Sequence, residues 1–169
     1  VKAVVIRVNS GGGDAFASEQ IWHQVMELKK KKPVVVSMGG YAASGAYYMS
    51  APASWIVAQP TTLTGSIGIF AVFPDFSGLV TQKLGVKFDE VKTNRNSTFG
   101  NLMARPFNEE ETAIMQQYVN RGYQLFRKRV ADGRRLPVES VEKIAQGRVW
   151  LGADAIGLKL VDQLGGLDD

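Results

Sequence analysis

The stretch "PVVVSMGGYAASGAYYMSAPASWIVAQP", Pro33–Pro60, contains the pattern that decides the fold. It opens with a continuous apolar run, "PVVVSMGG", which predicts a buried strand. The next segment, "AASGAYYMSAPA", has the small and aromatic residues of a buried helix that stops near Pro52, and "SWIVAQP" then repeats the strand pattern. Strands that alternate with helices imply parallel pairing, so the sequence predicts a layered α/β fold.

The residues before this stretch show the same order of elements. "VKAVVIRVN", Val1–Asn9, is a β-branched run that ends in a glycine cluster and predicts a buried strand with a tight turn. "DAFASEQIWHQVMELKKKK", Asp14–Lys32, has apolar residues at helical spacing and lysines at the end where the helix dipole favours cations. We therefore expect a strand, a turn and a helix here.

The second half of the chain is predicted to contain both irregular and helical segments. "TQKLGVKFDEVKT", Thr81–Thr93, indicates a helix end followed by another strand, and the polar residues 96–106 indicate a loop. Asn108 and three glutamates form a good helix start, which predicts a long helix ending near Gly133. A shorter helix is expected from Val138 to Gln146.

Length and composition favour one globular domain. The chain has 169 residues, of which 45% are hydrophobic, so we expect residues 1–169 to form a single domain. The net charge is +4, with basic clusters at Lys29–Lys32 and Arg127–Arg135. Because no aromatic residues interleave with these basic ones, we interpret the clusters as solvated helix ends and expect no nucleic-acid partner.

The composition also limits the possible chemistry. The absence of cysteine excludes disulfides, thiolate metal sites and cysteine nucleophiles. His23 is the only histidine, so a Ser-His-Asp triad would depend on it, and a zinc site with several histidines is excluded. Its position among Ile21, Trp22 and Val25 of a predicted helix favours a surface or packing role. We expect no cofactor and no metal.

The segment from Pro33 to Pro74 contains no charged residue and no histidine. Glycines, prolines, serines and threonines interrupt it, so it lacks the run of about 20 strongly apolar residues that a membrane span requires. The chain begins without Met in a strand-like run and shows no signal-peptide pattern. We expect it to be a fragment of a longer protein.

Two loops follow predicted parallel strands, at the end of the sheet where ligands bind in open α/β folds. In "NSGGGD", Asn9–Asp14, successive glycines allow N–H groups to point outward, as an anion cradle or an oxyanion hole requires. A simple turn is the alternative. The dinucleotide-binding fingerprint does not fit, because Phe16 stands where the third small residue is needed.

The second loop lies in "SMGGYAASGAYY", Ser37–Tyr48. If Ser44 begins a helix after a glycine turn, the Gly45 N–H would face an anion that forms on the substrate of the serine. Ala42 and Ala46 replace the glycines of a Gly-x-Ser-x-Gly elbow, so close packing of small residues remains an alternative.

A serine nucleophile needs a base, and the choices are His23 or a neutral lysine. The charge-free surroundings of Ser44 suit a lysine whose pKa is lowered by burial, although buried segments commonly lack charge. The hydroxyl of Ser66, near Gly65 and Gly68, could orient such an amine or could cap a turn.

Three segments carry a family resemblance: "VIRVNSGGGDAFASE", "KPVVVSMGGYAASGAYYMSAPASWIVAQPTTLTGSIGIF" and "GRVWLGADAIGLKLVDQLG". In this order they resemble signal peptide peptidase A, also called protease IV, a family of bacterial membrane-anchored serine proteases with the ClpP/crotonase fold. The resemblance covers nearly the whole chain and is greatest to the carboxyl-terminal half of the long, two-half form. It implies a ClpP/crotonase-like layered fold of mostly parallel strands and flanking helices.

The resemblance also implies roles for individual residues. Ser44 corresponds to the nucleophile, Gly12 and Gly45 to the two oxyanion-hole donors, and Ser66 to the residue that hydrogen-bonds the catalytic lysine. The family usually has proline at the position of Gly11. We therefore expect a looser turn that keeps its donor.

The catalytic lysine is where this chain departs from the short members of the family. There it follows the strand that corresponds to "FDEVKT", whereas "VKTNRNST" in this chain places Ser97 at about that position. Lys92 is near in sequence, but we expect it on the surface. In the long form the amino-terminal half supplies the lysine, so we expect the base to come from a segment outside this chain.

The resemblance further implies the setting of the reaction. It implies cleavage of signal-peptide remnants and other apolar peptides by a homo-oligomer, a tetramer in the full-length protein. That protein would be anchored in the bacterial inner membrane with its catalytic domain facing the periplasm. Two alternatives remain: a crotonase-like acyl-CoA hydratase or isomerase, for which no glutamate base lies between Pro33 and Pro74, and a catalytically silent scaffold half.

Overall fold

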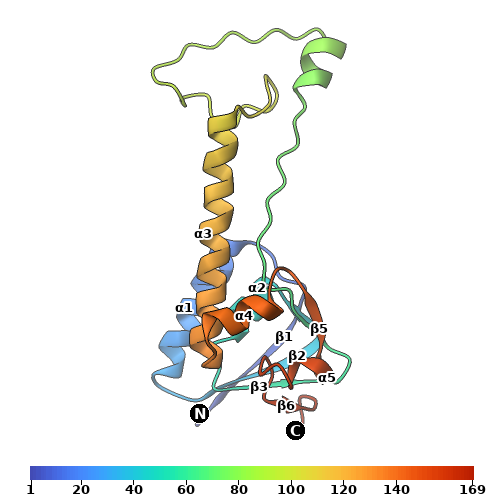
Figure 1. Cartoon of the computed structure of the whole chain (residues 1–169). Coiled ribbons are helices and arrows are strands. Elements are labelled where there is room, and N and C mark those ends of the chain that lie inside the picture. Colours follow the sequence, from blue (N-terminus) through green and yellow to red (C-terminus); the bar gives the residue numbers. More distant parts are fainter. The chain divides into compact units, whose positions relative to one another are not determined.

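The computed structural model describes all 169 residues, which divide into two compact units (Figure 1). Unit 1 comprises Val1–Ile69 and Gly122–Asp169, and unit 2 comprises Phe70–Arg121. The expectation that residues 1–169 form a single domain stays a prediction.

Unit 1 contains a six-stranded sheet whose pairs are all parallel except one. The central strand, β2, pairs with three neighbours, β1, β3 and β4, while β6 extends the sheet beyond β3 and β5 pairs antiparallel with β4. The strands are β1 (Val4–Ser10), β2 (Val34–Ala43), β3 (Trp55–Ala58), β4 (Leu63–Gly65), β5 (Val149–Leu151) and β6 (Gln163–Leu164). The predicted α/β fold of mostly parallel strands is confirmed.

The helices of unit 1 pack on this sheet and share one hydrophobic core with it. Buried side chains from β2 and β3 meet those of α2 and of the second half of α3, among them Met38, Ile56, Tyr47 and Phe126. The helices of the chain are α1 (Ala15–Lys29), α2 (Gly45–Ser50), α3 (Glu109–Arg134), α4 (Val138–Ile144) and α5 (Gly152–Ala155). Helix α3 begins in unit 2 and ends in unit 1.

An irregularity in the pairing of β1 with β2 shapes the end of the sheet. The register runs from Val8 opposite Met38 to Ser10 opposite Ala42, so β2 contains extra residues here. The Asn9 side chain fills the bulge: its Oδ1 accepts from the Tyr41 N–H at 3.1 Å, and it lies against Gly39. The carboxyl ends of β1 and β2 are therefore neighbours, which brings the glycine turn beside Ser44.

Two predicted elements differ from the structure. The helix around Ser44 begins at Gly45 rather than at Ala42, because Ala42 and Ala43 pair with Thr64 and Gly65 of β4. The strand expected within Thr81–Thr93 is wrong: the π-helix η1 (Gly78–Lys83) is followed by irregular chain. A strand needs a neighbour for its hydrogen bonds, and unit 2 contains no other strand to pair with.

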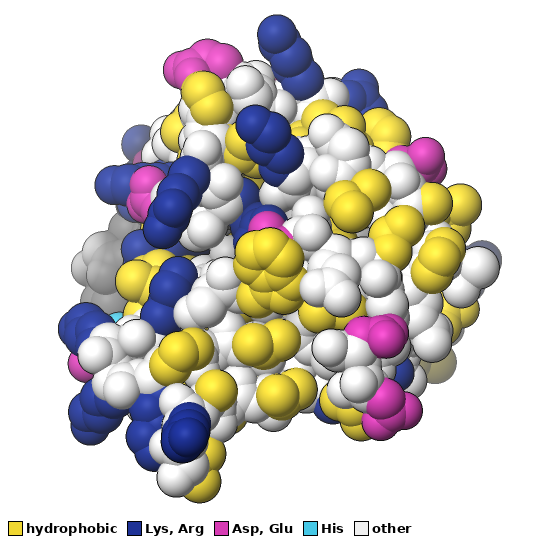
Figure 2. Space-filling view, turned by 90° about the horizontal axis from the view of Figure 1, so that it is seen from below, with side chains coloured by type: hydrophobic (Ala, Val, Ile, Leu, Met, Phe, Trp, Pro, Cys, Tyr) yellow, Lys and Arg dark blue, Asp and Glu magenta, His cyan; other side chains and the backbone are white.

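The basic ends of α1 and α3 lie close to one another. Partial burial lowers the pKa of Lys29, and the positive charges of Arg135 and Arg134 lower it further. Figure 2 shows Lys and Arg side chains gathered along one side of the face that it views. None of the helices is both long and apolar enough to cross a membrane.

Candidate active site

The glycine turn after β1 packs directly against the backbone of Ser44 and Gly45. Gly12 has φ 104°, and a Cβ added to it would lie 2.7 Å from the Gly45 nitrogen and 2.8 Å from the Ser44 Cβ. These distances are too short for any side chain, and the positive φ favours glycine as well. The structure thus brings together three of the residues that the sequence singled out, from segments about thirty positions apart.

Ser44 occupies the sharp turn between β2 and α2 with a strained backbone. Its φ of 52° and ψ of −123° are unfavourable for a residue with a side chain. It is the N-cap residue of α2, yet its side chain makes no capping hydrogen bond, so the hydroxyl is free for another role. The Ser44 N–H donates to the Gly65 carbonyl at 2.9 Å, and the residue is partly exposed rather than sealed between helix and sheet.

Ser66 directly follows Gly65, whose carbonyl accepts the hydrogen bond from the Ser44 N–H. It also has a positive φ, 48°, and its N–H donates to the Arg148 carbonyl at 2.7 Å. The preceding Gly65 has φ 79°, and a Cβ there would lie 2.9 Å from the Trp150 ring. Two serines in strained turns are therefore joined through the Ser44–Gly65 hydrogen bond. This arrangement is consistent with the predicted pairing of Ser44 and Ser66 around a lysine, which stays a prediction.

The backbone N–H groups around Ser44 differ in whether they already have a hydrogen-bond acceptor. The Gly12 N–H, the donor expected from the sequence, points to the Ser10 Oγ at 3.2 Å. The Gly13 N–H has no acceptor within unit 1, and its nitrogen would lie 3.2 Å from a Cβ built on Gly45. The N–H of Gly45 begins α2 and has no side-chain acceptor. In this conformation Gly13 and Gly45 present the free N–H groups, and Gly12 joins them only when its bond to Ser10 opens.

A pocket of about 300 Å³ adjoins these amides. Gly12, Gly13 and Gly45 form one part of its lining, and Ser18 from α1 lies beneath Gly45. The rest of the wall is mainly apolar, contributed by Val8, Ala17, Ile21, Ala46 and Met49. An apolar side chain placed in this pocket would have its backbone near the free amides.

The two charged residues that line the pocket are both engaged elsewhere. The Asp14 carboxylate accepts from the Ala17 N–H at 2.7 Å and so caps α1. Arg7 donates through Nη1 to the Ser37 Oγ at 2.7 Å. No group of three or more His, Cys, Asp or Glu side chains is arranged to hold a metal ion.

The histidine and the lysine cluster of unit 1 provide no evident base for Ser44. His23 is exposed in the middle of α1. The lysines of the run 29–32 lie at the far end of the same helix from the glycine turn, where the Lys29 Nζ donates to the Pro52 carbonyl at 2.6 Å.

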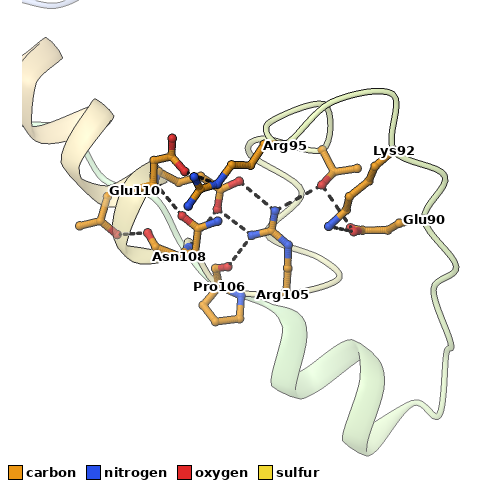
Figure 3. Close-up of polar contacts among 10 residues, drawn as sticks. Glu90, Lys92, Arg95, Arg105, Pro106, Asn108 and Glu110 are labelled. Atoms are coloured by element: carbon orange, nitrogen blue, oxygen red, sulfur yellow. Dashed lines mark hydrogen bonds and ion pairs between the residues drawn. The ribbon is translucent and has the colours of Figure 1, made fainter.

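Lys92 belongs to unit 2 and to a polar cluster at the start of α3 (Figure 3). Its Nζ pairs with the Glu90 carboxylate at 2.8 Å. An amine engaged in an ion pair with a carboxylate of its own unit is not free to accept the proton of a serine. This contact supports the expectation that Lys92 is not the general base.

The centre of the same cluster is the buried carboxylate of Glu111. Arg105 binds it with two nitrogens, at 2.6 and 2.8 Å, and the Asn108 N–H donates to it at 2.9 Å. These hydrogen bonds, from Arg105 first and from Asn108 second, lower the Glu111 pKa from 4.5 to about 2. The cluster therefore ties the loop before α3 to the first turn of that helix.

A comparison with protein-family models decides the relationship of this chain. The model of peptidase family S49 matches residues 26–169, which include Ser44, Gly45 and Ser66. The chain belongs to peptidase family S49. The matched segment is most of the chain, so the sequence resemblance to signal peptide peptidase A is confirmed at the level of the family.

Several curated relatives of this S49 chain are similar along its whole length. "Protease 4" of Haemophilus influenzae is 45% identical over 100% of the chain, which covers 27% of that protein. "Serine protease SPPA, chloroplastic" of Arabidopsis thaliana is 40% identical over 98% of the chain, which covers 24% of it. "Putative signal peptide peptidase SppA" of Enterococcus faecium is 36% identical over 100%, and 49% of it is covered. The S49 chain thus spans from about a quarter to about half of these relatives.

Some residues around the S49 site were not singled out from the sequence. Asn9 supports the bulge, Ser18 closes the space beneath Gly45, and Gly13 presents a free amide. The run "NSGGGD" indicated that a backbone donor lay in this turn. It did not indicate which glycine nitrogen would be free, because that depends on the direction of the Ser10 hydroxyl.

Proposed function

We propose that this chain provides the nucleophile and the oxyanion hole of a Ser/Lys peptidase that cleaves signal-peptide remnants and other apolar peptides. The observation that carries the proposal is the conformation of Ser44: a strained serine with an uncapped hydroxyl, packed against the glycine turn. The glycine turn and Gly45 line an apolar pocket. Membership of a serine peptidase family supports it.

In this mechanism the Ser44 Oγ attacks the scissile carbonyl carbon while its proton passes to a lysine amine. The Gly45 N–H and an N–H of the glycine turn stabilise the resulting oxyanion. Gly12 is the donor expected from the family, and Gly13 is the free one in this conformation. Collapse of the intermediate breaks the C–N bond, the lysine returns the proton to the leaving amine, and water then hydrolyses the acyl-enzyme. Ser66 orients the lysine.

The lysine in this proposal comes from another segment, namely an amino-terminal half like that of the long family members. The ion pair of Lys92 with Glu90 favours this over a base within the chain. The assembly would be a homo-oligomer, a tetramer in the full-length protein, anchored in the bacterial inner membrane with the site in the periplasm.

Activity measurements with and without the lysine-bearing half test the proposal. The chain alone should hydrolyse an apolar fluorogenic peptide barely above background, and co-assembly with that half should restore turnover. Brisk turnover by the chain alone that disappears in both Ser44→Ala and Lys92→Ala would disprove the external base. Failure of a correctly assembled protein to cleave would favour a silent scaffold half.

A further inference from the structure

A second polar cluster joins three helices of unit 1 behind the catalytic turn. The Glu19 carboxylate on α1 accepts a short hydrogen bond from the Tyr48 hydroxyl on α2. It also accepts from Arg129 on α3, at 2.5 Å from Nη2 and at 3.3 Å from Nε. The Arg129 guanidinium lies 3.6 Å from the centre of the Trp22 ring, which fixes its plane. One carboxylate therefore connects α1, α2 and α3.

This cluster is sheltered from solvent. The side chains of Glu19 and Arg129 are 27% and 22% exposed, and Tyr48 is buried with its ring 4.8 Å from that of Phe126. Burial raises the Tyr48 pKa, and the hydrogen bond to Glu19 raises it further, so the phenol stays protonated and donates. Hydrogen bonds between a hydroxyl and a carboxylate are stronger than neutral ones, and shelter from water strengthens them.

The hydrogen bond between Glu19 and Tyr48 lies about one turn behind the site on both helices. Glu19 is in the first turns of α1, which directly follows the glycine turn. Tyr48 is one turn beyond Ser44, and its N–H donates to the Ser44 carbonyl at 2.8 Å. The bond therefore ties the helix after the glycine turn to the helix after Ser44.

We propose that Glu19 and Tyr48 are positioning residues that set the separation between the glycine turn and the Gly45 N–H. The glycine turn and the start of α2 are in close contact, because even a Cβ on Gly12 would lie 2.7 Å from the Gly45 nitrogen. Arg129 and Trp22 hold the carboxylate in place. The catalytic consequence rests on the proposed function, since it assumes that these amides bind an oxyanion, whereas the structural consequence does not.

The neighbouring Tyr47 provides a matched control on the same short helix. It is also buried, and its hydroxyl donates to the Leu160 carbonyl at 2.9 Å, which ties α2 to the segment after α5 rather than to α1. Tyr47→Phe and Tyr48→Phe each delete one buried hydroxyl from α2. If the Glu19–Tyr48 bond contributed only to stability, the two variants would behave alike.

The structural test uses the chain itself and does not depend on activity. In ¹H–¹⁵N NMR spectra, Tyr48→Phe should shift the Gly12, Gly13 and Gly45 amide signals by more than it shifts those of β2. Tyr47→Phe should leave these signals in place. Equal perturbation of the glycine amides by both variants, or by neither, would overturn the positioning role.

The catalytic test uses the chain assembled with its lysine-bearing half. Tyr48→Phe and Glu19→Ala should lower kcat about tenfold with little change in KM, because a displaced oxyanion donor weakens transition-state binding. Glu19→Gln keeps an acceptor for Tyr48 and should restore most of kcat, while Tyr47→Phe should keep it unchanged. Equal kcat losses in Tyr47→Phe and Tyr48→Phe would overturn the proposal. Full activity in Ser44→Ala would instead overturn the proposed function and leave the amide measurement valid.

Discussion

The N-cap residues of α1 and α2 differ in whether their side chains cap the helix. At the start of α1, Asp14 has an ordinary extended backbone, and its carboxylate accepts from the Ala17 N–H at 2.7 Å. At the start of α2, Ser44 could cap in the same manner, yet its side chain makes no capping bond and its φ is 52°. A residue type that normally stabilises a helix start here leaves it uncapped and strained, which is typical of a functional position.

The start of α3 is capped by side chains, as that of α1 is. There the Asn108 Oδ1 accepts from the Glu111 N–H at 2.8 Å, and the Glu111 carboxylate accepts from the Asn108 N–H at 2.9 Å. This reciprocal capping box satisfies two donors at once. The starts of α1 and α3 are thus capped by side chains. Those of α2, η1, α4 and α5 are not, and among these N-cap residues Ser44 alone has a positive φ.

The largest expected effect is that of removing the free Ser44 hydroxyl. In the assembled protein, Ser44→Ala should lower kcat by at least about a thousandfold, because no other group can form the acyl-enzyme. The measurement is turnover of an apolar peptide, with circular dichroism to show an unchanged fold. Ser140→Ala, on α4, removes a serine hydroxyl elsewhere and should keep full activity. Retention of activity by Ser44→Ala would show that the uncapped Ser44 hydroxyl is not needed for catalysis.

The next effect concerns the contact between the two helix starts. Gly12→Ala should lower kcat/KM about a hundredfold, since its Cβ would push against the Gly45 nitrogen and displace the oxyanion donors. Gly11→Ala is the matched control, because a Cβ on Gly11 would meet nothing within 4 Å. If both variants lost the same activity, flexibility of the turn rather than close packing would explain the effect.

Acid should weaken the capping box of α3 and change the rest of the molecule much less. The Glu111 pKa is lowered from 4.5 to about 2 by Arg105 first and by the Asn108 N–H second. A carboxylate with a lowered pKa in the folded state stabilises that state above its unfolded pKa, and this contribution is lost as the pH falls from about 4.5 towards 2. Amide signals of unit 2 should therefore broaden over this range.

Fluorescence provides an internal reference for this experiment. The three tryptophans, Trp22, Trp55 and Trp150, all belong to unit 1, so their emission should respond to the loss of Glu111 contacts much less than the unit 2 amides. Glu111→Gln should abolish much of the pH dependence in this window. Loss of both signals at a single pH in the parent chain would contradict a separate role for the capping box.

The smallest expected effects are on stability and have opposite signs at the two helix starts. Asp14→Ala removes a cap and should lower the free energy of unfolding by about 1 kcal/mol. Ser44→Gly relieves a positive φ without losing a capping bond and should raise it by about 1 kcal/mol, with loss of activity. Urea unfolding of both variants measures the difference. A decrease in both variants would show that Ser44 contributes to stability and is not strained.

Much of this fold was predictable from local patterns. The strands within Val1–Asn9 and Pro33–Gly40, the lysine-terminated helix after the glycines and the long helix after Asn108 all occur, with boundaries shifted by a few residues. The predicted strand within Thr81–Thr93 failed because strand formation depends on a partner that the residues themselves do not specify. The helix start moved from Ala42 to Gly45 for a related reason, namely the pairing of β2 with β4.

The sequence by itself determined the α/β class, because hydrophobic periodicity and turn residues act locally. The resemblance of its motifs indicated the family and the residues at the site. The tertiary structure decided how those residues are used: that Ser44 is strained and uncapped, that Gly12 allows no side chain, and that its N–H points to Ser10. It also decided that Glu19 meets Tyr48. These features arise from the register of β1 on β2 and from helix packing, which bring distant segments within bonding distance.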